Sequence, residues 1–260
     1  MPKISVNSIE MDYGDTGRGK VLLFLHGLGS TKKDWDLQVP FFSRNYRVIT
    51  PDLRGHGNST KPEKAYGVEF MAEDIKQFLN ALDIDKATLI GFSMGGAVAF
   101  HFAYAYPNRI DKLVIVNSGP DFNNMGKTGE DLLAHRTEFL KTKGLPPLAK
   151  EIAGNMFPEP HQEKMRRDFE ERCSSNDFNA YYNTFVTLMH WGLGNNIKKI
   201  KAKTLVIASD MDYTPVAFKE AYIKNLKDAR LSVIKNSRHG VTMDQPDAFN
   251  NELQNFLSNA

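Results

Sequence analysis

Gly91-Phe92-Ser93-Met94-Gly95-Gly96 is the stretch that decides the expected fold of this chain. It ends a strand-like apolar run, residues 87–92, and opens an alanine-rich helical stretch, residues 93–106. When a Gly-x-Ser-x-Gly pattern joins a strand to a helix, the serine lies on a sharp turn and the glycines let strand and helix cross closely. A helix-capping serine is the alternative, since serine is a favoured N-cap. The context favours Ser93 as a nucleophile at the carboxyl edge of a sheet.

The segments on both sides of this stretch alternate between strands and helices. Apolar runs of the kind found in strands buried on both faces occur at residues 21–25, 47–49 and 113–116. Residues 70–82 carry apolar side chains along one helical face, and residues 31–42 also predict a helix. Regular alternation indicates a parallel sheet flanked by helices, which is the α/β class. Near the start of the chain, Asn7-Ser8 predicts a hairpin turn.

The alternation stops in the middle of the chain and then resumes. Residues 121–199 show no convincing strand, and four helical stretches are expected there, at 131–140, 148–156, 161–172 and 179–190. Strands then follow at 204–208 and 231–234, and helices at 215–226 and 248–257. We therefore expect a core domain formed by residues 1–120 and 199–260. A helical cap (lid), residues 121–198, is inserted over one end of the sheet.

Composition and charge exclude several classes of protein. The 260 residues suffice for one large domain, and 33 basic against 31 acidic residues give a net charge of +2. We expect neither a nucleic acid nor a stable membrane association, and we expect a monomer or homodimer. A single cysteine, Cys173, forms no internal disulfide, and the first residues lack an apolar signal region. These features favour a cytoplasmic protein.

A serine hydroxyl needs a neighbouring base, and chain order selects one histidine. In this kind of sheet the expected order is Ser, then Asp or Glu, then His. His239 alone lies in the loop after the last strand, so we expect it to be the base. The other six histidines precede the serine, lie on its helix or lie in the insertion: His26, His56, His101, His135, His161 and His190.

Asp210 and Asp212 both follow the strand at 204–208, and the residues alone do not separate them as the acid that orients the base. An oxyanion hole requires backbone donors. The expected donors are the N–H groups of Met94, after the nucleophile, and of Leu28, in the loop after residues 21–25. Zinc-ligand spacing, a phosphate-binding loop and a dinucleotide motif are absent from the sequence, so neither a metal nor a cofactor is expected.

Four ordered motifs resemble the α/β-hydrolase fold family, in particular its small esterase, lactonase and haloperoxidase-like members. They are His26-Gly27-Leu28-Gly29, the stretch from Asp52 to Ser59, the Ser93 hexapeptide and His239. The resemblance implies a mostly parallel eight-stranded sheet flanked by helices, with a helical cap inserted after strand 6. It selects Asp212, because Ser209-Asp210-Met211-Asp212 matches the family's Gly-x-x-Asp with Ser209 replacing glycine. Arg238 replaces a frequent glycine before the histidine.

The resemblance also implies the reaction. A serine at position 93 argues against the family's dehalogenases and epoxide hydrolases, which use aspartate there. We expect hydrolysis of small to medium carboxylic esters through an acyl-enzyme. The same triad is compatible with a carbon–carbon bond hydrolase, a perhydrolase, an acyltransferase or a slow-turnover small-molecule sensor. Trp35, Phe185, Leu188 and Trp191 are substrate-pocket candidates, with a place in the apolar core as their alternative.

Overall fold

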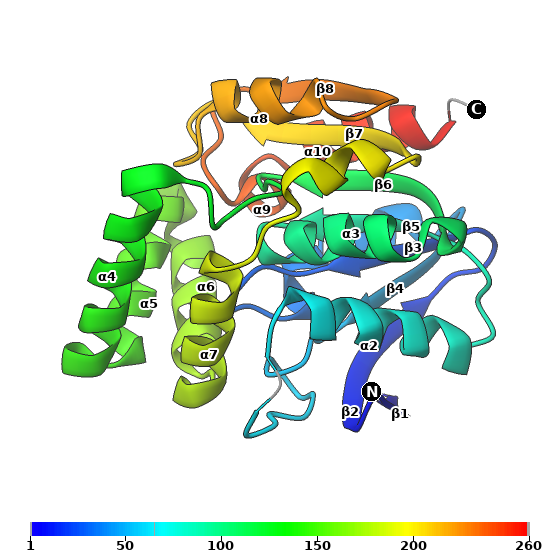
Figure 1. Cartoon of the computed structure of the whole chain (residues 1–260). Coiled ribbons are helices and arrows are strands. Elements are labelled where there is room, and N and C mark those ends of the chain that lie inside the picture. The colour runs from blue at the N-terminus through cyan, green and yellow to red at the C-terminus, as the bar shows by residue number, and fades with distance from the viewer. Residues whose placement is uncertain (1, 65, 259–260) are drawn as a thin grey trace.

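The computed structural model describes residues 2–64 and 66–258 and has one eight-stranded sheet at its centre (Figure 1). The strand order is β1-β2-β4-β3-β5-β6-β7-β8. Only β1–β2 and β2–β4 pair antiparallel, so the sheet is mostly parallel, as predicted. The strands are β1 Lys3–Val6, β2 Ile9–Thr16, β3 Val21–Leu25, β4 Arg47–Pro51, β5 Ala87–Phe92, β6 Ile110–Val116, β7 Lys203–Ser209 and β8 Ala229–Ile234.

The predicted hairpin is confirmed at β1–β2. Its two turn residues, Asn7 and Ser8, have φ values of 44° and 63°, which are typical of the two-residue turns whose twist matches that of paired strands. The Asn7 amide donates to Asp74 at 2.7 Å and so ties the hairpin to helix α2.

Helices cover both faces of the sheet, because successive side chains of each buried strand point to opposite faces. In β3, Leu23 and Leu25 pack against one group of helices, while Leu22 and Phe24 pack against the other. The first group is α2 Val68–Ala81, α3 Met94–Ala105 and α8 Val216–Ile223. The second is α1 Val39–Phe42, α9 Val241–Asp244 and α10 Pro246–Ser258.

The single helix predicted at residues 31–42 is wrong. A 3-10 turn, Lys32–Trp35, and the short helix α1 replace it. Pro40 stands at the start of α1, and a proline inside a continuous helix would remove a hydrogen bond and clash with the carbonyl four residues earlier.

The insertion after β6 is helical, as predicted. Figure 1 shows its four helices standing beside the sheet, beyond the carboxyl ends of the parallel strands. They are α4 Gly126–Lys143, α5 Leu145–Met156, α6 Glu163–Ser174 and α7 Phe178–Met189.

The two ends of the insertion meet. Asp121 forms an isolated antiparallel bridge with Gly192, and the Asp121 carboxylate accepts the N–H of Gly194 at 2.7 Å. The insertion therefore leaves and rejoins the core at one point, which we call the neck (residues 121–123 and 191–194). In the described part of the chain, no helix is both long and apolar enough to cross a membrane.

Candidate active site

Ser93 lies on the strained turn that the glycine pattern predicts. Its φ is 52°, a conformation that side-chain-bearing residues rarely adopt. A Cβ on Gly91 would lie 2.2 Å from the carbonyl oxygen of Gly95, and one on Gly95 would lie 2.2 Å from that of Leu25. Glycine at these positions is therefore what lets α3 approach β5 and β3 closely enough to form the turn.

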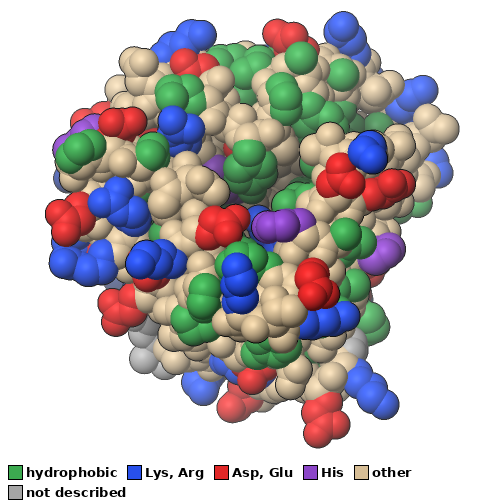
Figure 2. Space-filling model, turned by 90° about the vertical axis from the view of Figure 1, so that its left-hand side faces the viewer, with side chains coloured by type: hydrophobic (Ala, Val, Ile, Leu, Met, Phe, Trp, Pro, Cys, Tyr) green, Lys and Arg blue, Asp and Glu red, His purple; other side chains and the backbone are tan. Residues whose placement is uncertain are grey.

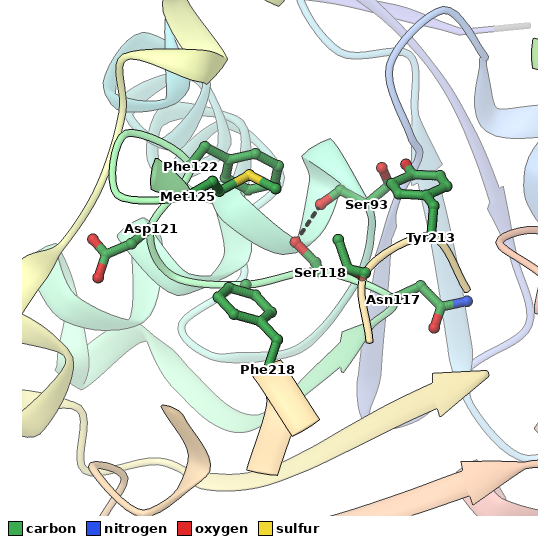
Figure 3. Close-up of a pocket in the computed structure, with 10 residues that line it drawn as sticks. Ser93, Asn117, Ser118, Asp121, Phe122, Met125, Tyr213 and Phe218 are labelled. Atoms are coloured by element: carbon green, nitrogen blue, oxygen red, sulfur yellow. Dashed lines mark hydrogen bonds between the residues drawn. The ribbon is translucent and has the colours of Figure 1, made fainter. Parts of the chain in front are cut away.

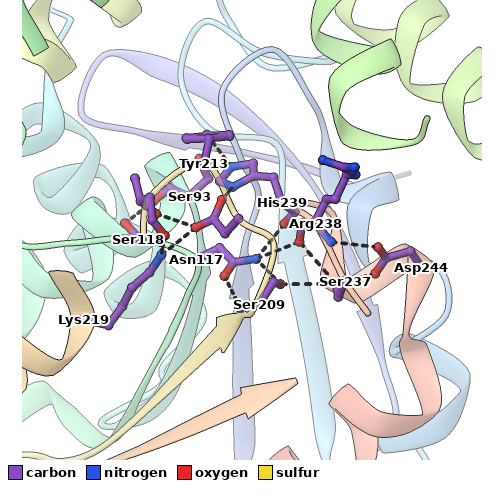
Figure 4. Close-up of polar contacts among 12 residues, drawn as sticks. Ser93, Asn117, Ser118, Ser209, Tyr213, Lys219, Ser237, Arg238, His239 and Asp244 are labelled. Atoms are coloured by element: carbon purple, nitrogen blue, oxygen red, sulfur yellow. Dashed lines mark hydrogen bonds and ion pairs between the residues drawn. The ribbon is translucent and has the colours of Figure 1, made fainter. Parts of the chain in front are cut away.

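His239 lies at the same edge of the sheet as Ser93 (Figure 4), and there it contacts Asp212, 27 residues earlier in the chain. The Nδ1 atom of His239 is 2.8 Å from Oδ1 of Asp212. The imidazole lies against the ring of Phe92, with 5.0 Å between ring centroids. Asp210 points elsewhere: its carboxylate accepts the backbone N–H of Ser237 at 3.2 Å, so it supports the histidine loop.

Lys219 of α8 binds the other oxygen of Asp212. Its ammonium donates to Oδ2 of Asp212 at 2.6 Å and also to both oxygens of Thr214, and its side chain is fully buried. Burial by itself would raise the pKa of the Asp212 carboxyl, but the charges and hydrogen bonds of His239 and Lys219 hold that pKa at about 2. Burial lowers the pKa of Lys219. Asp212 is therefore a buried carboxylate held in its ionised form.

Tyr213, next to Asp212, contacts the other side of the imidazole. Its hydroxyl is 2.7 Å from Nε2 of His239, and the two ring centroids are 4.2 Å apart. Among the described hydrogen bonds, none joins Ser93 directly to His239, and the Tyr213 hydroxyl holds the imidazole nitrogen that a serine base would use. The structure thus joins Asp212, His239 and Tyr213 by hydrogen bonds, and Ser93 lies beside them at the same edge of the sheet (Figure 4).

The predicted oxyanion donors, Leu28 and Met94, flank the serine. Met94 is the first residue of α3, so no carbonyl within the helix accepts its N–H. The loop that carries Leu28 touches the serine, since a Cβ on Gly27 would lie 3.5 Å from Cβ of Ser93. The cap packs on the same loop: a Cβ on Gly29 would lie 2.8 Å from the ring of Tyr181.

A small cavity opens beside Ser93 and Tyr213 (Figure 3). Its volume is about 20 Å³, enough for about one water molecule. Apolar side chains at the start of the insertion and on α8 supply part of its wall: Phe122, Met125 and Phe218. On the face that carries the cap, basic and acidic side chains are interspersed, and hydrophobic side chains lie around a central hollow (Figure 2).

The four predicted pocket residues do not line this cavity. Trp35 is fully buried in the core against Phe24, with ring centroids 4.8 Å apart. Leu188 and Trp191 are buried in the core where the cap joins it, and Phe185 is buried in the second cluster with other cap residues. All four occupy packed interiors, which is the alternative that their apolar side chains left open.

Sequence reasoning missed several polar residues around the site. Asn117, at the end of β6, donates to the carbonyl of His239 at 2.8 Å, and the Ser118 hydroxyl donates to the carbonyl of Ser93 at 2.7 Å. Their signal was available, because polar residues directly after a buried parallel strand lie at the edge where sites form. Lys219 gave no such signal, since a lysine on a helix ordinarily faces water.

Arg136 of α4 was also missed. Its guanidinium carbon lies 5.0 Å from the ring centroid of Phe185. Burial raises the pKa values of Tyr181 and Tyr213, and the positive charge of Arg136 opposes that rise in both. The cap therefore places a cation near the hydroxyl that contacts His239.

Comparisons with known proteins agree with the fold described above. A family model described as alpha/beta hydrolase fold matches residues 20–246. A 2-hydroxy-6-oxo-6-phenylhexa-2,4-dienoate hydrolase of Burkholderia cepacia is 30% identical, over 98% of this chain and 93% of that protein. A 3-oxoadipate enol-lactonase of Acinetobacter baylyi is 27% identical, over 96% and 94% of the two chains.

An esterase from Exiguobacterium antarcticum superposes with a TM-score of 0.91 at 25% identity, over 98% of each chain. The match to uncharacterized mycobacterial proteins is 39% identical but local, and this chain spans only 30% of their length. Since the family model covers most of the sequence and the fold agrees from end to end, the chain belongs to the alpha/beta hydrolase fold family.

Proposed function

We propose that this hydrolase cleaves small to medium carboxylic esters through an acyl-enzyme on Ser93, Asp212 and His239. The observation that carries the proposal is the placement of these three side chains at one edge of the sheet. The serine lies on the strained strand–helix turn, and a buried carboxylate holds the imidazole at 2.8 Å. A serine activated by an oriented histidine is the usual arrangement for acyl transfer in this fold.

The proposed reaction begins when Nε2 of His239 accepts the Ser93 proton and Oγ attacks the ester carbonyl. The negative oxygen of the tetrahedral intermediate is held by the N–H groups of Leu28 and Met94. His239 then protonates the leaving alcohol. Water, deprotonated by the same imidazole, hydrolyses the acyl-enzyme and releases the acid. Asp212 stays ionised throughout and stabilises the imidazolium, in keeping with its pKa of about 2.

The walls of the cavity support an ester with an uncharged acyl group. Phe122, Met125 and Phe218 offer apolar contact beside the serine. These residues come from the start of the insertion and from α8, so the substrate would lie where the cap meets the core.

Arg136 favours a second candidate, a lactone or carbon–carbon bond hydrolase whose substrate carries a carboxylate. Its positive charge acts on the Tyr213 hydroxyl, beside the serine. The names of two relatives, an enol-lactonase and a dienoate hydrolase, describe activities of those proteins that the same three residues could perform.

A panel of p-nitrophenyl esters of graded chain length tests the first proposal. Wild-type protein should turn over short and medium esters, and Ser93→Ala should lose on the order of 10³-fold or more in kcat/KM. Full activity in Ser93→Ala would exclude the mechanism. If wild type hydrolyses none of the esters, a carboxylated lactone and a dienoic acid become the substrates to test.

Substituting Asp210 and Asp212 one at a time tests which of the two aspartates orients His239. Asp212→Asn should lower kcat much more than Asp210→Asn, since only Asp212 contacts the imidazole. A larger loss from Asp210→Asn would reverse the assignment.

A further inference from the structure

The Tyr213 hydroxyl occupies the one atom of His239 that the reaction needs. Nδ1 of the imidazole pairs with Asp212, so in neutral histidine Nδ1 carries the proton and Nε2 is the acceptor. The hydroxyl, 2.7 Å from Nε2, must therefore donate to it. A nitrogen with one lone pair accepts one such hydrogen bond, so Ser93 cannot donate its proton there at the same time.

The same side chain also borders the space beside the serine. Tyr213 and Ser93 line one cavity, and the Tyr213 hydroxyl is bound to His239 at its edge. The cavity left beside Ser93 has a volume of about 20 Å³, room for about one water molecule. An ester that approaches Oγ of Ser93 through this cavity needs more room than it offers, so a side chain of its wall must move.

Tyr213 as a residue lies largely at the surface, while the residues beside it are held. It is 66% exposed, although its hydroxyl end is buried against His239, so rotation into water would break that one hydrogen bond and a ring contact. On either side of it, Lys219 binds the Asp212 carboxylate and both oxygens of Thr214. Rotation of the tyrosine side chain therefore opens the site without shifting Asp212.

We propose that Tyr213 is a gate: in the resting enzyme its hydroxyl holds Ser93 and His239 apart, and rotation of the side chain into solvent lets substrate reach the serine. The proposal rests on the proposed roles of Ser93 and His239. When the gate is mostly closed, only the open fraction of molecules can react. The apparent reactivity of the serine is therefore its intrinsic reactivity multiplied by that open fraction. Removing it should therefore raise that reactivity.

Covalent labelling by a small fluorophosphonate tests the gate, because it reports the reactivity of Ser93 without requiring the natural substrate. The second-order labelling rate should rise on the order of tenfold in Tyr213→Phe, which keeps the ring but cannot donate to Nε2. Tyr213→Ala should rise at least as much. Tyr106→Phe is the matched control: it removes a hydroxyl that donates to Glu73 at 2.6 Å, away from the site, and should leave the rate unchanged.

Each outcome supports or overturns the gate. A rate that is unchanged or lower in both Tyr213 variants excludes it, and a lower rate would instead give the hydroxyl a direct part in the reaction. A rise in Tyr213→Ala alone would assign the obstruction to the ring and exclude the hydrogen bond as its cause. If Ser93→Ala were labelled as fast as the wild type, the proposed function itself would be contradicted. This result is distinct from those that contradict only the gate. Circular dichroism confirms that each variant is folded.

Discussion

Two turns at the same edge of the sheet carry the site, and different forces shape them. The turn at Ser93 is set by sterics: its glycines leave no space for a Cβ, and no charge is involved. The turn from Asp212 to Thr214 is set by a buried ion pair and hydrogen bonds centred on Lys219. Substitutions that add volume at the Ser93 turn should therefore change the free energy of unfolding in a way that does not depend on pH. Changes at the Asp212–Thr214 turn should affect it in a way that does depend on pH.

Lys219→Met should have the largest effect, since it removes one partner of a fully buried ion pair. Loss of one partner from such a pair typically destabilises a protein by about 3–5 kcal/mol. Urea unfolding of Lys219→Met should show a loss of this size, together with a lower kcat. Lys224→Met, at an exposed position just after the same helix, should change neither. Equal effects in the two variants would mean that the ion pair does not hold the turn.

Gly95→Ala should come next, by overpacking the Ser93 turn. The added methyl group would lie 2.2 Å from the backbone oxygen of Leu25, so α3 must shift away from β3, at a cost of about 1–3 kcal/mol. Gly154→Ala is the contrasting case: no atom lies within 4 Å of the new Cβ, and the residue is in helix α5. That variant should be stabilised by about 0.5–1 kcal/mol. If both substitutions changed the free energy of unfolding in the same direction, steric contact would not be what sets the Ser93 turn.

Acid should weaken the Asp212 turn by about 2 kcal/mol. A carboxyl whose pKa falls from the ordinary 3.8 to about 2 on folding stabilises the protein above pH 4, and this contribution is lost as the pH falls toward 2. The difference in unfolding free energy between wild type and Asp212→Asn should shrink accordingly from pH 5 to pH 2. The difference between wild type and Gly95→Ala should stay constant across that range, and an equal pH dependence would erase the contrast between the turns.

Arg136→Gln should have the smallest effect, confined to substrates that carry a carboxylate. If the cap cation binds that group, kcat/KM for a p-nitrophenyl hemisuccinate should fall about tenfold, roughly 1.4 kcal/mol. The value for p-nitrophenyl butyrate should not change. Lys127→Gln removes the same charge from an exposed position of helix α4 and serves as the control. A parallel loss with both esters would remove the argument for the second candidate function.

The contrast between the turns also explains what could be predicted from sequence. Steric requirements leave local patterns, so Gly91, Ser93 and Gly95 could be read from one hexapeptide, and chain order then identified His239. Buried charge pairs leave none: Lys219 resembles any surface lysine of a helix, and Tyr213 resembles a solvated loop residue. Asp210 and Asp212 differ only in which group each contacts, and that depends on how two distant loops fold together.

The cap shows the same limit. Its helices were predicted from periodicity and proline punctuation, but periodicity marks an apolar face without saying what that face covers. Phe185, Leu188 and Trp191 therefore looked equally suited to a pocket and to a core. The structure places them in the packed interior. The apolar part of the cavity wall comes instead from Phe122 and Met125, at the start of the insertion, and from Phe218 of α8.

The neck has a consequence for how such a protein can diversify. Because the Asp121–Gly192 bridge closes the insertion where it begins, the strands on either side pair without reference to its length. Lengthening a loop whose ends are already joined costs little free energy. Segments of other sizes could thus be exchanged at this junction while Ser93, Asp212 and His239 keep their places, so that new selectivity can evolve around an unchanged candidate site.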